Sequence, residues 1–108
     1  MNKKLLSLLG MARRAGRVSM GFDAASESMK KGQSKLLLLA GDISQRTRNS
    51  ILVTAEQTGT PAVSAGCTME EIGSALGKGQ TGIVSINDSG FAASVKALCD
   101  ENSQEECI

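Results

Sequence analysis

The chain has 108 residues, 41% of them hydrophobic and 21% charged, so it is long enough for one domain with a modest core and too short for a two-domain enzyme. Twelve basic residues against eleven acidic ones give a net charge of only +1, and there is no histidine. The absence of histidine excludes catalysis by an imidazole.

The charges are unevenly distributed along the chain. Residues 1–48 hold ten basic and three acidic residues, a net charge of +7, whereas residues 49–108 hold two basic and eight acidic residues, a net charge of −6. Such an asymmetry is typical of a protein that binds a polyanion, although two oppositely charged faces can also serve solubility alone.

The three cysteines, Cys67, Cys99 and Cys107, include no CxxC pair, so the sequence predicts neither a metal site nor a cofactor. No secretory leader and no apolar run of the roughly 18 residues that a membrane span needs can be found. We therefore expect a cytoplasmic protein with free thiols and no membrane contact.

The first half of the chain alternates between helical and extended patterns. Apolar residues at helical spacing predict a helix over residues 2–15, a short extended segment over 18–20 and a second helix over 22–32. Residues 36–40 are five consecutive apolar residues, too few for a helix, and they predict a strand that is covered on both faces.

The alternation continues in the middle of the chain. A third helix is predicted from a cap at Ser44 to Gly59, followed by a short strand over residues 62–65. The spacing of Thr68 and Glu71 predicts a capping box at the start of a fourth helix.

The last elements are a strand over residues 82–86 and a final helix capped by Asp88. Residues 100–108 carry four acids and no apolar periodicity, which predicts a flexible acidic tail after a single domain over residues 1–99. Helices and strands that alternate with short links predict an α/β protein, a three-layer α/β/α sandwich with a four-stranded mixed sheet.

An ordered series of short motifs runs through the chain. They are LLGMARRAGR (8–17), Gly21, KG (31–32), KLLLLA (35–40), Asp42, GTP (59–61), IGSALGK (72–78), IVSI (83–86) and DSGFA (88–92). In this order and spacing the series resembles the bacterial YlxQ-type branch of the kink-turn-binding ribosomal-protein superfamily over about residues 3–98.

This resemblance implies an RNA-binding protein of the translation apparatus, whose relatives bind a sharply bent RNA loop with tandem sheared G·A pairs. Two elements would contact the RNA: the start of the second helix, where backbone amides meet phosphate, and the loop 78–81 before the last strand. With the neighbouring basic residues, the implied RNA-binding residues are Arg13, Arg14, Arg17, Gly21, Phe22, Asp23, Lys31, Lys35, Lys78, Gly79, Gln80 and Thr81.

The chain departs from the motif of the kink-turn binders, Gly-x-Asn-Glu-x-x-Lys. On those positions it carries Gly21, Asp23, Ala24 and Glu27. Asp23 can still accept hydrogen bonds from the N–H groups of guanine, but Ala24 can read nothing, and Glu27 replaces a phosphate contact with a repelling charge.

Phe22 begins an apolar stripe with Ala25 and Met29, which favours a core position over base stacking. No nucleophile has a base beside it, so the chain is not expected to be an enzyme. The primary hypothesis is a non-enzymatic accessory protein of the ribosome or its assembly that binds structured RNA, with ribosome-associated proteins as further partners. The alternative is a protein-interaction module that has lost kink-turn recognition.

Overall fold

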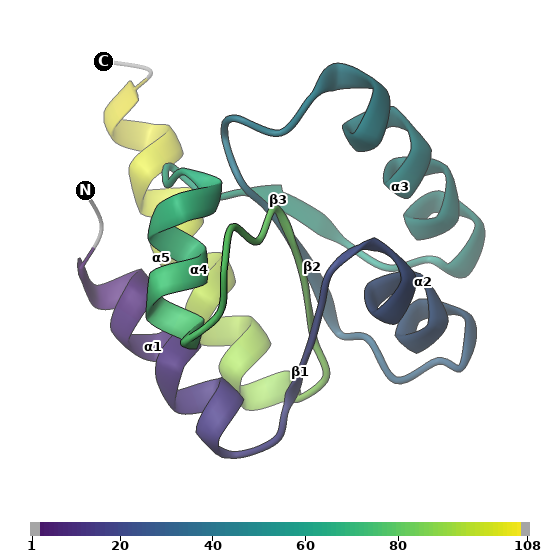
Figure 1. Cartoon of the computed structure of the whole chain (residues 1–108), viewed down its shortest axis with the longest axis horizontal. Coiled ribbons are helices and arrows are strands. Elements are labelled where there is room, and N and C mark those ends of the chain that lie inside the picture. The colour runs from purple at the N-terminus through teal and green to yellow at the C-terminus, as the bar shows by residue number, and fades with distance from the viewer. Residues whose placement is uncertain (1–2, 107–108) are drawn as a thin grey trace.

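The computed structural model describes residues 3–106, and the side chains of residues 3–99. Within that part of the chain, five helices alternate with four strands (Figure 1). The elements are α1 (Lys3–Arg14), β1 (Val18–Met20), α2 (Phe22–Lys30), β2 (Leu36–Leu39), α3 (Gln45–Thr58), β3 (Ala62–Ser64), α4 (Met69–Leu76), β4 (Ile83–Ile86) and α5 (Ser89–Glu106).

The four strands form one mixed sheet in the order β1-β4-β2-β3. The last strand, β4, lies between β1 and β2 and runs antiparallel to both, while β2 and β3 are parallel. The register places Met20 opposite Val84 and Leu39 opposite Ile83, so the ends of β1 and β2 share one edge of the sheet with the start of β4.

Helices cover both faces of this sheet. Helices α1, α4 and α5 lie on one face and α2 and α3 on the other (Figure 1). The α/β/α sandwich predicted from the alternation is therefore confirmed.

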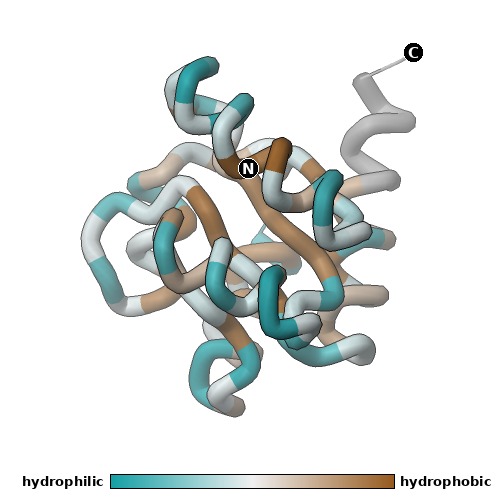
Figure 2. Tube along the Cα trace, turned by 90° about the vertical axis from the view of Figure 1, so that its right-hand side faces the viewer, coloured by the Kyte–Doolittle hydropathy of each residue, from teal (hydrophilic) through white to brown (hydrophobic). Residues whose placement is uncertain are grey.

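The run of leucines in β2 explains how one strand supports two cores. Leu36 and Leu38 point into the core beneath α1, α4 and α5, whereas Leu37 and Leu39 point into the core beneath α2 and α3. All four are at most 1% exposed, as the uninterrupted apolar run predicts. A strongly hydrophobic stretch crosses the middle of the molecule in Figure 2, with hydrophilic segments around it.

The predicted helix caps are confirmed. Ser44 Oγ accepts a hydrogen bond from the Thr47 amide, and the capping box of α4 joins Thr68 and Glu71 in both directions. Asp88 Oδ2 accepts from the Phe91 amide at the start of α5. Each such cap satisfies backbone donors that a helix leaves unpaired at its start.

The final helix is longer than its apolar pattern. Its backbone is helical to Glu106, where the sequence predicts a flexible tail from residue 100. A helix can continue beyond its packed part because each further residue adds a backbone hydrogen bond and most polar residues have a modest helix propensity. The domain boundary at residue 99 stays a prediction.

Residues 3–106 contain no helix that is long and apolar enough to cross a lipid bilayer.

Candidate nucleic-acid interface

Three segments far apart in the sequence meet where β1 and β2 end and β4 begins. Gly21 follows β1 directly, Ser44 follows β2 after a short turn, and the loop 78–82 leads into β4. Together with Met69 they form a depression of about 360 Å³, called the hollow below. It is lined by Gly21, Phe22, Ile43, Ser44, Thr47, Met69, Lys78, Gln80, Thr81, Gly82 and Ile83.

The loop that forms one wall of the hollow is fixed to α4. The Thr81 amide donates to the Met69 carbonyl at 3.0 Å, and the Lys78 amide donates to the Gly73 carbonyl at 2.8 Å. A Cβ atom on Gly73 would lie only 2.1 Å from the Gly79 carbonyl oxygen, so the loop approaches α4 where only a glycine fits. The hollow is therefore preformed.

The start of α2 forms the opposite wall. Gly21 adopts a φ of 95°, which glycine adopts readily, and its amide donates to the Ile83 carbonyl at 2.9 Å. No described side chain caps this helix, so the amides of its first turn remain available to an anion. The dipole of α2 adds to the attraction for a negative charge.

Phe22 lies outside the core, so the prediction of a core position is wrong. Its side chain is 40% exposed and lines the hollow. As the first residue of α2, Phe22 lies beyond the sheet, and Ala25, Ser28 and Met29 form the buried face of the helix in its place. The hollow thus has an aromatic ring on its wall, while Ile43 and Met69 supply further apolar surface.

The four residues of the loop 78–81 differ in exposure. Thr81 is only 4% exposed, and its hydroxyl donates to the Gly79 carbonyl at 2.9 Å. Its side chain therefore shapes the loop, whereas Lys78, Gly79 and Gln80 are exposed.

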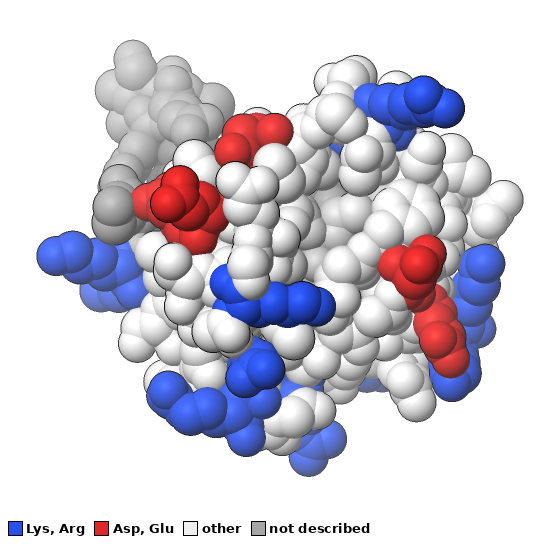
Figure 3. Space-filling view, viewed as in Figure 1, with Lys and Arg blue, Asp and Glu red and all other residues white. Residues whose placement is uncertain are grey.

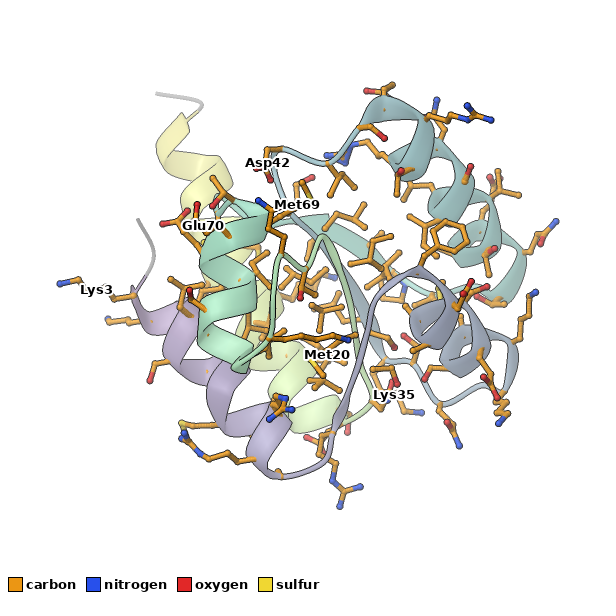
Figure 4. The ribbon with its side chains drawn as sticks, viewed as in Figure 1. Lys3, Met20, Lys35, Asp42, Met69 and Glu70 are labelled. Carbon is orange, nitrogen blue, oxygen red and sulfur yellow. The ribbon has the colours of Figure 1, made fainter. Side chains whose placement is uncertain are left out.

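The predicted basic residues do not form one surface around the start of α2. Among the described residues, Lys78 is the one cation that lines the hollow. Arg17 and Lys35 precede β1 and β2 and so lie at the opposite edge of the sheet, where Asn87 and Ile86 bond to their backbones. In Figure 4, Asp42 and Met69 lie together at one end of the sheet and Lys35 at the other. Strand direction separates these cations, because Lys78 lies at the hollow and Arg17 and Lys35 lie at the other edge of the sheet.

The other predicted cations also lie outside the lining of the hollow. Lys31 Nζ lies 2.7 Å from Glu27 Oε1 one turn back on α2. The hydrogen bond from Lys31, together with its charge, lowers the pKa of Glu27 below its ordinary value. Arg14 lines a separate groove between α1 and α4 that also contains Glu70 and Glu71. Arg13 lies in the last turn of α1.

Sequence reasoning did not include Ile43 and Met69 in the site. They belong to segments that follow β2 and β3, and they line the hollow with Phe22 because β1 and β2 both end beside the start of β4. The one local indication was that Ile43 interrupts a polar turn between Asp42 and the Ser44 cap.

The family model of the ribosomal protein L7Ae/L30e/S12e/Gadd45 family matches residues 3–102, so the chain belongs to this family. The resemblance found in the sequence motifs is thereby confirmed.

Two relatives match nearly the whole chain. The RNA-binding protein YlxQ of Bacillus subtilis is 29% identical over 93 residues, which cover 86% of this chain and 92% of that protein. A structure from Bacillus halodurans, described as a protein with unknown function, superposes with a TM-score of 0.84 at 29% identity, covering 92% of this chain and 99% of the other.

A more distant structure shares the fold. The 15.5 kD RNA binding protein of Giardia lamblia superposes with a TM-score of 0.72 at 18% identity, covering 94% of this chain and 92% of the other.

Proposed function

We propose that this chain is a non-enzymatic, cytoplasmic RNA-binding protein that binds structured RNA at the hollow as an accessory factor of the ribosome or its assembly. The observation that carries the proposal is the preformed hollow, which combines an exposed aromatic ring with an uncapped helix start. The RNA-binding relative in Bacillus subtilis and the family membership support it.

Each wall of the hollow has a distinct role in this proposal. The ring of Phe22, with the apolar side chains of Ile43 and Met69, would pack against a base that is turned out of its stack. Lys78 and the amides at the start of α2 would bind phosphate. Asp23, exposed in the first turn of α2, would accept hydrogen bonds from a guanine edge.

Kink-turn RNA is the structured RNA proposed as ligand, with altered contacts at the start of α2. Ala24 is exposed in the first turn of α2 and offers no polar group to a base. Glu27 already pairs with Lys31 and presents a negative charge on the same helix. We therefore expect weaker discrimination between kink-turn and other RNA than an asparagine and a lysine at these positions would give.

The test is a binding titration with a kink-turn hairpin, comparing the wild-type chain with Phe22→Ala. Loss of base stacking on the ring lowers affinity by about 5-fold to 150-fold, since a stacked base contributes about 1–3 kcal/mol. Val53→Ala is the matched control, because Val53 is also a large exposed apolar residue but lies on α3 outside the hollow.

Two results would contradict the proposal. One is equal affinity of Phe22→Ala and wild type for the hairpin. The other is negligible binding of wild type to every structured RNA at low salt.

A protein-interaction module is the second candidate function. It is favoured by the separation of the predicted cations, since Lys78 alone among the described cations lines the hollow. Pull-down from lysate with and without ribonuclease separates the two functions. Ribosome-associated partners that survive ribonuclease support the interaction module, and partners lost with the RNA support RNA binding.

A further inference from the structure

A second set of positive charges lies at the sheet edge opposite to the hollow. Arg17 directly precedes β1 and Lys35 directly precedes β2, and the first residue of each strand pairs with Ile86 of the central β4. Their backbones are therefore two strand spacings apart, about 10 Å.

Helices α5 and α1 add further cations to this edge. Lys96 of α5 lines a depression of about 350 Å³ together with Lys35, Ser89 and four apolar residues, Leu36, Pro61, Ala92 and Ala93. Arg13 lies in the last turn of α1, and its carbonyl accepts a hydrogen bond at 2.9 Å from the Gly16 amide in the turn that leads into β1. We call Arg13, Arg17, Lys35 and Lys96 the basic edge.

The four charges of the basic edge are not neutralised by the rest of the described molecule. All four side chains are exposed, and the one ion pair among described residues joins Lys31 and Glu27. The carboxylate of Asp88 lies near this edge, but it caps α5 through the Phe91 amide at 2.9 Å. Figure 3 shows basic side chains gathered over the lower end of α1, where the chain enters β1.

We propose that the basic edge is a second RNA-binding surface, which contacts phosphates without regard to base sequence and acts separately from the hollow. It depends on the proposed function only in taking RNA as the ligand. A run of cations on one edge is sufficient to bind a phosphate backbone and to release its counterions.

The composition of this edge favours RNA over an acidic protein segment. A protein partner gains most of its affinity from large apolar or aromatic anchors in a buried pocket. The large exposed apolar residues of the described chain are Met11, Phe22 and Val53, and none of them lines the depression beside Lys35 and Lys96. Phosphate needs no such anchor.

The two surfaces are separated by the length of the central strand. Strand β4 runs from the hollow to the basic edge over Ile83–Ile86, which corresponds to about 10–13 Å. A single RNA that reaches both surfaces must run along the flank of the sheet, so each surface contributes its own share of the affinity.

The test measures the salt dependence of binding to two RNAs, the kink-turn hairpin and a plain RNA duplex of equal length. The basic-edge variant combines three substitutions, Arg17→Ala, Lys35→Ala and Lys96→Ala. The control variant removes three cations outside the basic edge by Lys3→Ala, Lys4→Ala and Lys30→Ala. Thermal unfolding of both variants verifies that they remain folded, which their exposed positions lead us to expect.

The basic-edge variant should lower the slope of log K against log salt by about 2–3 units on both RNAs, because each lost phosphate contact removes about 0.7–0.9 units. The control should change the slope by less than one unit. A slope for the basic-edge variant equal to that of wild type would overturn the proposal. Binding of poly-glutamate to the wild-type chain as tightly as the RNA duplex would also overturn it, because that result would indicate an acidic protein partner. If Phe22→Ala has no effect while the duplex slope still falls, the hollow proposal fails and the basic edge stands.

Discussion

Glu27 and Lys31 lie one turn apart on the exposed side of α2, with their charged atoms 2.7 Å apart. Both side chains are more than half exposed, so the pair contributes little to folding, but it engages a cation close in sequence to Lys35 of the basic edge. We therefore expect the loss of this pair to change RNA affinity more than the free energy of unfolding.

The substitution Glu27→Gln should therefore increase RNA affinity and steepen the slope of log K against log salt by about one unit. The substitution removes a negative charge and frees Lys31 to meet a phosphate. Titrations of an RNA duplex at several salt concentrations measure the slope. Glu56→Gln on α3 removes the same charge elsewhere, and an equal change in that control would contradict a specific role for the pair.

Gly73 matters for a steric reason. Its missing side chain lets the Gly79 carbonyl approach α4, where a Cβ atom would lie at 2.1 Å. We expect Gly73→Ala to destabilise the fold by about 1–3 kcal/mol, the typical cost of overpacking, and to weaken hairpin binding because the loop forms a wall of the hollow.

Urea unfolding and RNA titration measure the two effects of Gly73→Ala. Gly79→Ala is the matched control, because a Cβ there meets nothing within 4 Å and should change stability by less than about 1 kcal/mol. If Gly73→Ala is as stable as this control, the loop is not held by the close approach.

A chain of partly buried hydrogen bonds joins the edge strand β1 to its neighbours. Asn87 Nδ2 donates to Ser19 Oγ of β1 at 3.0 Å, and Ser19 Oγ lies 2.7 Å from Ser28 Oγ of α2. On its other side, Asn87 Oδ1 bonds to Ser85 of β4 at 2.7 Å. This network connects β1, β4 and α2, which carry one wall of the hollow.

Asn87→Ala should destabilise the protein by about 1–3 kcal/mol, since it removes the two hydrogen bonds to Ser19 and Ser85, each of which contributes about 0.5–1.5 kcal/mol. Urea unfolding gives the free energy, and hydrogen exchange of the β1 amides should accelerate more than that of β2. Asn49→Ala on the exposed side of α3 serves as control and should change stability by no more than about 0.5 kcal/mol. Equal exchange in β1 and β2 would contradict the role of the network.

The elements themselves could be predicted because each one is specified locally. The Ser44 cap, the Thr68 capping box and the leucine run of β2 all occur within a few neighbouring residues, and the structure has each where it was expected. The ends of strands shifted by only one residue, and α5 extended because a helix can outlast its apolar stripe.

The site could be predicted only in part. The start of α2 and the loop 78–81 do line the hollow together. Which cations join them depends on the strand order β1-β4-β2-β3, a long-range property that no local pattern contains. Arg17 and Lys35 therefore lie at the edge of the sheet away from the hollow, which the sequence does not reveal. Phe22 is predicted in the core because its position relative to the sheet edge is not visible in the periodicity.

The sheet separates two cores, and the strands β2 and β4 contribute side chains to both. Leu38 belongs to the core under α1, α4 and α5, and Leu37 to the core under α2 and α3. Each is fully buried, so Leu37→Ala and Leu38→Ala should each cost about 2–5 kcal/mol.

The double variant should lose nearly the sum of the two single losses, because the side chains point to opposite faces and belong to different core clusters. A domain of this size is stable by about 5–15 kcal/mol, so the double variant should populate the unfolded state at 25 °C. Far-UV circular dichroism in urea measures all three variants. Two separate transitions in either single variant would show that the layers unfold independently, contrary to this expectation.

The position of β4 also orders events during synthesis. The strand that completes the centre of the sheet is made after the other three, and β1 pairs with β4 alone among the strands. While the ribosome is still adding the residues before Ile83, β1 has no neighbour, Gly21 lacks the carbonyl to which its amide bonds, and the two walls of the hollow are not joined. A nascent chain therefore completes the hollow only near the end of translation, once β4 has been made.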